Sequence, residues 1–138
     1  MILIDTHIWI WWSARPELLP VRVRSTLDEA ALDANVAVSV VSVWEIATKA
    51  ALGKLRVENL PPGMSVRDWV ERASRIPGLT ILPLAPDVAL ASAELPKPFH
   101  RDPADRLIVA QARLRRATLI TADRKILAYP HVKTLWEC

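Results

Sequence analysis

Short apolar runs alternate along the chain with longer segments in which apolar residues recur at helical spacing. The runs predicted to be buried strands are residues 2–4, 36–40, 79–82, 118–121 and, as a fifth, 132–135. The segments predicted to be helices are residues 7–12, 21–32, 43–52, 65–76, 86–95 and 103–116. Apolar strands separated by helices indicate an α/β fold: a single domain over residues 1–138 with a central, mostly parallel sheet of about five strands flanked by helices.

Capping residues and stop signals define several of the predicted helix ends. Ser42 and Glu45 form the S-x-x-E pattern of a capping box, and Gly53 is a stop signal at the other end of the same helix. Asp102 followed by Pro103 is a start signal for the helix that runs to about residue 116. Clusters of Pro, Gly and polar residues predict loops at residues 13–20, 57–63 and 97–103.

Four carboxylates occupy corresponding places in this predicted scaffold. Asp5 and Asp123 directly follow strands, whereas Glu45 and Asp105 lie in the first turns of helices. Taken singly, each fits a helix cap or a residue that compensates a helix dipole, but two of these helices already have other capping residues. Because parallel strands end at a common edge of the sheet, the four side chains are expected to converge there.

A cluster of four carboxylates needs charge compensation. Two carboxylates about 4 Å apart repel by roughly 4 kcal/mol at an effective dielectric constant of about 20, so the cluster requires protons or a cation. Carboxylate oxygens around an open position suit Mg²⁺ or Mn²⁺. Such a site lowers the pKa of a bound water and screens an attacked phosphodiester. The sequence therefore predicts a metal site with hydrolytic chemistry, in which Asp5 is a ligand.

Other side chains near these acids support more than one interpretation. The hydroxyls of Thr6 and Thr121 can orient water or a ligand, and local hydrogen bonding to the backbone explains them equally well. His7, His100 and His131 offer acid–base catalysis on an RNA 2′-hydroxyl as an alternative to metal chemistry. These histidines are scattered among different predicted elements, which favours the metal interpretation.

The composition and the apolar runs also indicate where in the cell the protein is located. The chain has 138 residues, of which 51% are apolar and 24% charged, as in ordinary globular domains. No apolar run approaches the roughly 18 residues of a membrane span, and Asp5 interrupts the N-terminal apolar stretch too early for a signal peptide. Cys138, the lone cysteine, can form no disulfide within the chain. A cytoplasmic location is therefore expected.

The charge balance is mildly basic. There are 18 Lys and Arg residues against 15 Asp and Glu, and the pI is about 9.4. This excess permits an anionic partner such as nucleic acid without requiring one. Arg113, Arg115 and Arg116 crowd the end of a predicted helix, where dipole compensation and phosphate binding explain them equally well.

Four sequence segments together resemble the PIN-domain ribonucleases, and among these the VapC-type toxins of bacterial toxin–antitoxin pairs. The segments, in chain order, are DTHIWIWW, SVWEIATKAALGKL, FHRDPADRLIVAQA and TLITADRKI. The resemblance extends over nearly the whole chain, and RDPADRLIVAQA followed by TLITAD is its most specific part. It implies an endoribonuclease dependent on Mg²⁺ or Mn²⁺ that acts on RNA, forms a homodimer and is neutralised by a VapB-type antitoxin.

The resemblance also implies a set of site residues. The acidic quartet of the family falls on Asp5, Glu45, Asp105 and Asp123, with Asp102 as a fifth acid that also caps a helix. Two departures concern packing alone: Ala104 stands where many relatives have Phe, and Ile126 and Leu127 stand where an aromatic residue is usual. The candidates for contacts with RNA phosphate, all near the acids, are His100, Arg101, Arg106 and Arg124.

The tryptophans divide into two groups. Trp9, Trp11, Trp12 and Trp44 lie in strongly apolar stretches, which favours packing in the core or at a dimer interface over base stacking. Trp69 has charged neighbours and is predicted to be exposed, in contact with an antitoxin or a partner subunit.

Three other functions compete with a metal-dependent nuclease. A phosphoryl-transfer hydrolase with Asp5 as its nucleophile would normally have a second Asp two residues later as the general acid, where this chain has His7. A receiver-type Mg²⁺-binding signalling domain would need an acidic pair near the first strand and a Lys after a late strand, and Lys125 is not well placed. A catalytically silent PIN-like domain that binds RNA is the third, and the intact quartet disfavours it.

Overall fold

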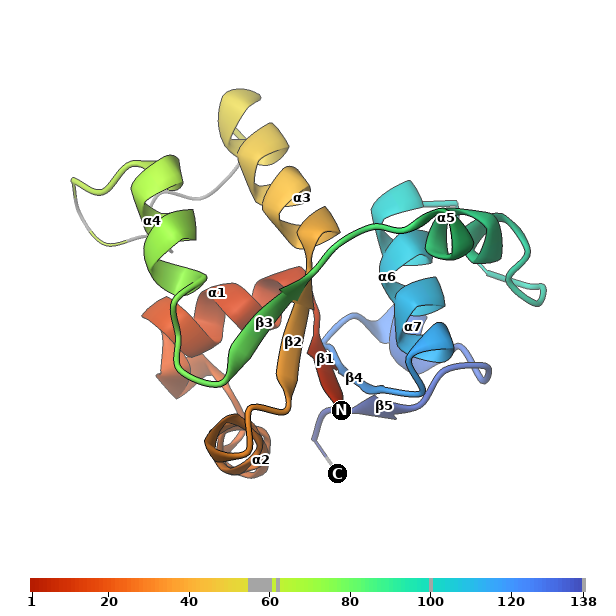
Figure 1. The fold of residues 1–138 in the computed structure, drawn as a ribbon, viewed down its shortest axis with the longest axis horizontal. Coiled ribbons are helices and arrows are strands. Elements are labelled where there is room, and N and C mark those ends of the chain that lie inside the picture. Colours follow the sequence, from red (N-terminus) through yellow and green to blue (C-terminus); the bar gives the residue numbers. More distant parts are fainter. Residues whose placement is uncertain (55–60, 62, 100, 138) are drawn as a thin grey trace.

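Five parallel strands form one sheet in a computed structural model that describes residues 1–54, 61, 63–99 and 101–137 (Figure 1). The strands are β1 (Ile2–Ile4), β2 (Val36–Ser39), β3 (Leu79–Leu82), β4 (Thr118–Ile120) and β5 (Thr134–Leu135). Their spatial order is β3-β2-β1-β4-β5. The predicted α/β fold with a parallel sheet is confirmed.

Helices pack on both sides of this sheet. They are α1 (Thr6–Ala14), the 3₁₀ helix η1 (Pro16–Leu18), α2 (Val21–Leu32), α3 (Val40–Ala51), α4 (Val66–Ala73), α5 (Pro86–Ala93), α6 (Pro103–Leu114) and α7 (Arg124–Leu127). In Figure 1, α1, α2 and α4 lie on one side of the sheet, and α5, α6 and α7 lie on the other. The sequence did not predict η1 and α7, because a helix of three or four residues is too short to show a periodicity.

Two apolar cores form because successive strand residues point to opposite faces. Leu3 and Ala37 belong to the core beneath α5 and α6, whereas their neighbours Ile4 and Val38 belong to the core beneath α1, α2 and α4. All four side chains are at most 1% exposed. Covering both faces explains why the strands are uniformly apolar instead of alternating with polar residues.

Helix α3 begins earlier than predicted, and the capping box at Ser42 is wrong. The N-cap is Ser39, whose Oγ accepts a hydrogen bond from the Val41 amide at 3.1 Å. The β-branched residues Val40 and Val41, which favour a strand in isolation, instead form the first turn. Ser42 is therefore inside the helix and fully buried, and Glu45 lies in the second turn.

Trp69 is a core residue, so its predicted exposure is wrong. It is 2% exposed, and its ring lies 5.1 Å from that of Trp9, whose Nε1 donates to the Ala73 carbonyl at 3.1 Å. Trp9 is fully buried, as predicted, and Trp11 and Trp12 pack partly buried against the same core. Trp44 is 58% exposed on α3, so it does not belong to the core of a single chain.

Parts of three sequence predictions lie outside the described residues. They concern most of the loop at residues 57–63, the candidate RNA contact His100 and the lone cysteine Cys138. Within the part of the chain that is described, the helices lack the length and apolar character that crossing a bilayer requires.

Candidate active site

The order of the strands indicates where a ligand crevice is expected: beyond the carboxyl ends of β1 and β4, at the centre of the sheet. From β1 the chain continues through β2 and β3 on one side, whereas β4 and β5 lie on the other side of β1. In parallel α/β sheets, ligands bind beyond the carboxyl ends of the strands at such a reversal of direction. Asp5 directly follows β1, and Thr121 and Asp123 follow β4, so these side chains flank the crevice.

Asp5 is buried with both carboxylate oxygens bonded. Its Oδ1 accepts from the Thr6 amide at 2.8 Å and caps α1, and its Oδ2 accepts from Thr121 Oγ1 at 2.7 Å. The side chain is 6% exposed. Burial raises the pKa of Asp5 above its ordinary value, although these two hydrogen bonds act in the opposite direction. The predicted cap is real, and the carboxylate is also held at the crevice.

Thr121 connects two of the acids. Its fully buried hydroxyl donates to Asp5 and accepts from the Asp123 amide at 3.0 Å. Asp123 in turn caps α7, because its Oδ1 accepts from the amides of Lys125 at 2.8 Å and Ile126 at 3.4 Å. A single hydroxyl therefore sets the separation between the acid after β1 and the acid after β4.

Helix α6 supplies two more acids. Asp102 is its N-cap, and the Oδ1 atom of Asp102 accepts from the Asp105 amide at 3.2 Å. Burial and the surrounding carboxylates together raise the pKa of Asp105 from 3.8 to about 7. In order of strength, the carboxylates that raise it are those of Asp5, Asp102, Asp123 and Glu45. The five acids predicted from sequence thus share one electrostatic environment.

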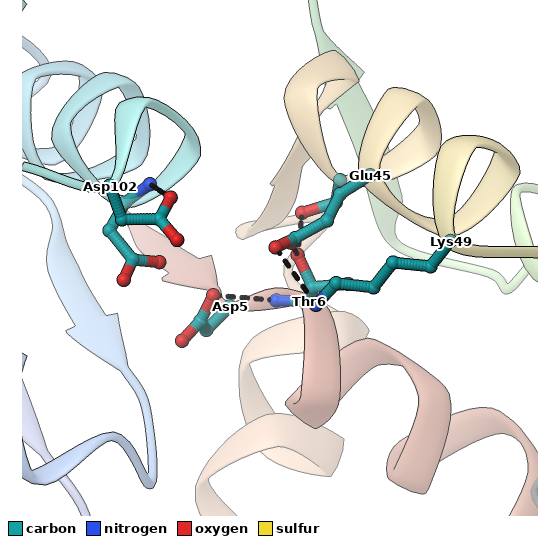
Figure 2. Close-up of polar contacts among 7 residues, drawn as sticks. Asp5, Thr6, Glu45, Lys49 and Asp102 are labelled. Atoms are coloured by element: carbon teal, nitrogen blue, oxygen red, sulfur yellow. Dashed lines mark hydrogen bonds and ion pairs between the residues drawn. The ribbon is translucent and has the colours of Figure 1, made fainter. Parts of the chain in front are cut away.

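Glu45 approaches from α3 and is held by neighbours that the sequence did not reveal. Its Oε1 accepts from Thr6 Oγ1 at 2.6 Å, and Lys49 Nζ lies 3.2 Å from its Oε2 (Figure 2). Thr6 Oγ1 also lies 2.8 Å from the buried hydroxyl of Ser42. The four-residue spacing of Glu45 and Lys49 on a predicted helix was the available signal for this ion pair.

In this structure the carboxylates lie too far apart to coordinate one metal ion together. Among the described residues, no three His, Cys, Asp or Glu side chains are close enough together to hold a metal ion. In Figure 2 the carboxylate of Glu45, on α3, is directed at Thr6 and Lys49. Asp102 lies on α6, across the site from Glu45. The donor set nevertheless consists of carboxylate oxygens, the ligands that Mg²⁺ and Mn²⁺ prefer. Burial, and after it the neighbouring carboxylates, raise the pKa of Asp105, which is consistent with a site that favours a bound proton or cation.

The basic candidates for RNA contact occupy different positions. Arg101 is exposed next to Asp102, and Arg124 is exposed as the first residue of α7. Arg106 instead donates from Nε to the Ser92 carbonyl at 3.1 Å and links α6 to α5. The two exposed arginines are therefore the ones available to an anion approaching the acids.

A large groove lies away from these acids. A groove of about 750 Å³ is lined by residues of α1, α2 and α4, among them Trp12, Asp28 and Arg72. Asp28 accepts a hydrogen bond from Trp12 Nε1 at 3.1 Å. None of the five acids lines this groove, so its size does not identify it as the site of chemistry.

Comparisons with known proteins agree with this architecture. Residues 2–132 match the PIN domain. Over 140 aligned residues the chain is 31% identical to Ribonuclease VapC22 of Mycobacterium tuberculosis, with 98% of each chain covered.

Two solved structures are similar in fold. A chain in the structure of FitAcB from Neisseria gonorrhoeae is 27% identical, with a TM-score of 0.68 over 98% of this chain and 96% of that one. A chain in the structure of VapBC2 from Rickettsia felis, bound to a promoter DNA fragment, has a TM-score of 0.70 at 19% identity, over 99% of this chain and 100% of that one. Taken with the domain match and the identity to a named ribonuclease, these findings show that the chain belongs to the PIN domain family.

Proposed function

We propose that this protein is a metal-dependent endoribonuclease and the toxin of a VapBC-type toxin–antitoxin pair, with residues 1–138 as its single PIN domain. The observation that carries the chemistry is the raised pKa of Asp105, which burial raises most and the four neighbouring carboxylates raise further. A relative that is 31% identical is named a ribonuclease. RNA is therefore the proposed substrate, and the cytoplasm is the proposed location.

The acids Asp5, Glu45, Asp105 and Asp123 would hold Mg²⁺ or Mn²⁺, with Asp102 as a further ligand. The cation, when bound, would lower the pKa of a water and neutralise charge on the attacked phosphodiester. Neighbouring hydroxyls restrain these acids: Thr121 bonds to the carboxylate of Asp5 and to the backbone amide of Asp123, and Thr6 bonds to the carboxylate of Glu45.

Binding of the RNA backbone would use positive charge at the rim of the crevice. Arg101 and Arg124 are exposed beside Asp102 and Asp123, so their guanidinium groups can reach phosphates that flank the scissile bond. His100 and Arg106 are the other predicted contacts, although Arg106 also binds the Ser92 carbonyl. A VapB-type antitoxin is the proposed protein partner, since structural relatives were solved as toxin–antitoxin complexes.

RNA cleavage is expected to depend strictly on a divalent cation. The purified protein should cut structured RNAs with Mg²⁺ or Mn²⁺, lose all cleavage in EDTA and regain it when Mn²⁺ is added in excess. Gel electrophoresis of end-labelled RNA measures this directly. Undiminished cleavage in EDTA would contradict the proposal and transfer the chemistry to His7 and His131.

A catalytically silent PIN domain that binds RNA is the second candidate. The observation that favours it is that the acids, as placed in the described chain, are not grouped closely enough to hold a metal. It predicts RNA binding without cleavage at saturating Mn²⁺. Membership of the PIN family removes the receiver-type alternative.

A homodimer is also proposed. Large apolar side chains are exposed on α2 and α3 or directly after them: Val21 (72%), Leu32 (88%), Trp44 (58%) and Leu52 (63%). Trp44→Glu is expected to weaken dimerisation at least about tenfold, since buried tryptophans are frequent interface hot spots. Its melting temperature as a monomer should change little, because Trp44 is not part of the core. Light scattering that shows only monomer for the parent protein across micromolar concentrations would contradict the dimer.

A further inference from the structure

Both carboxylate oxygens of Glu45 already have partners. Oε1 accepts a hydrogen bond from Thr6 Oγ1 at 2.6 Å, and Oε2 lies 3.2 Å from the ammonium group of Lys49. The Glu45 side chain is 14% exposed, so solvent screens this ion pair only partly. A metal cation cannot approach Oε2 closely while the Lys49 ammonium occupies its far side, because the two positive charges repel.

The side chain of Lys49 is partly open to solvent. Its side chain is 42% exposed, and it lies one helical turn beyond Glu45 on α3, at the edge of the site (Figure 2). An ammonium group on a flexible four-carbon chain can exchange one anionic partner for another with little strain. The anion that would approach this edge of an acidic, RNA-cleaving crevice is a backbone phosphate.

We propose that Lys49 is a positioning residue that holds Glu45 away from the other acids until an RNA phosphate takes its ammonium group. Release of Oε2 then lets Glu45 join the acids of β1, β4 and α6, so RNA binding and completion of the metal site are coupled. This inference rests on the proposed ribonuclease function. It also accounts for the finding that no three acids among the described residues are grouped closely enough for a metal.

An ordinary role for Lys49 is a pairing along the surface of a helix. Ion pairs at this four-residue spacing stabilise helices slightly. Loss of such a pair would change the affinities for a divalent cation and for RNA only slightly, because solvent and salt screen a single exposed charge. Those two affinities therefore distinguish a positioning role from a structural one.

The test is Lys49→Met, measured in two separate binding experiments. In the absence of RNA, Mn²⁺ affinity measured by electron paramagnetic resonance is expected to rise about fivefold, because Glu45 is no longer held by Lys49 and can join the other acids. In EDTA, where RNA is not cleaved, the affinity for an RNA oligonucleotide should fall. A plot of the logarithm of the association constant against the logarithm of the salt concentration should become less steep by about one unit. Lys49→Arg, which keeps the charge, should restore both values toward those of the parent.

Lys133→Met is the matched control. Lys133 is exposed immediately before β5, at the opposite end of the strands from the acids, and its replacement should leave Mn²⁺ affinity unchanged. If the parent binds Mn²⁺ and cleaves RNA while Lys49→Met binds Mn²⁺ no more tightly, the positioning role is wrong and the ribonuclease proposal stands. If the parent neither binds Mn²⁺ nor cleaves RNA, both proposals are wrong.

Discussion

Asp5→Asn is expected to abolish RNA cleavage without destabilising the metal-free protein. Asparagine caps helices almost as well as aspartate, so the hydrogen bond from the Thr6 amide is retained. Thr121 Oγ1 can accept from the new amide group in place of donating to Oδ2. The variant lacks one charge of the proposed metal site, and cleavage should therefore fall by about 10²- to 10³-fold or more.

The thermal stability of Asp5→Asn distinguishes a metal ligand at this position from a residue that only caps a helix. Because burial raises the pKa of Asp5, the ionised carboxylate disfavours the folded state at neutral pH. Asp5→Asn should therefore unfold at the same or a higher temperature than the parent when metal is absent. Asp68→Asn, at an exposed position in the first turn of α4, is the control for the substitution itself. Parent-level cleavage by Asp5→Asn would mean that Asp5 is a cap and nothing more.

The stability of the metal-free protein should decrease between about pH 4 and pH 7 because of Asp105. Its pKa is raised from 3.8 to about 7 in the folded state, so the folded protein binds one more proton than the unfolded chain in this range. The contribution is fully present below pH 3.8 and is lost as the pH rises through 7. A shift of this size corresponds to roughly 4 kcal/mol, which partial exposure to solvent reduces to about 2 kcal/mol.

Asp105→Asn isolates this contribution. Urea denaturation across the pH range should show a gain over the parent of about 2 kcal/mol at pH 7.5 and almost none at pH 4. Mn²⁺ should stabilise the parent at pH 7.5 and the variant much less, because the ligand binds the folded state. Identical pH dependence of the two proteins would show that the pKa of Asp105 is not raised in the folded protein.

The placement of several candidate site residues was predictable because they follow the ends of strands. Asp5 and Asp123 follow strands that are apolar on both faces, and parallel pairing brings those ends to one edge of the sheet. Asp105 was predictable from the Asp102–Pro103 start of α6, a local signal that needs no tertiary information.

Other features depend on contacts between distant segments. The start of α3 at Val40 was hidden, because a β-branched run favours a strand until the sheet dictates where β2 ends. That start determines which face Glu45 and Lys49 occupy, and the Thr6 partner of Glu45 comes from a segment 39 residues earlier.

Trp69 was mispredicted for a different reason. Its charged neighbours along the sequence suggested exposure, yet Val66, Trp69, Val70 and Ala73 fall on one face of a helix. All four belong to the core beneath α1, α2 and α4 or pack against it. Helical periodicity, and not the adjacent residues, was the informative signal.

The most direct test of the central claim is a Mn²⁺ anomalous-scattering map from crystals of the protein grown with a short RNA. The proposed function predicts an anomalous peak bounded by the carboxylates of Asp5, Asp105 and Asp123, with ligand distances near the 2.0–2.2 Å typical of small divalent cations. A map from well-occupied, catalytically active protein without a peak at these residues would contradict the metal site and the mechanism built on it.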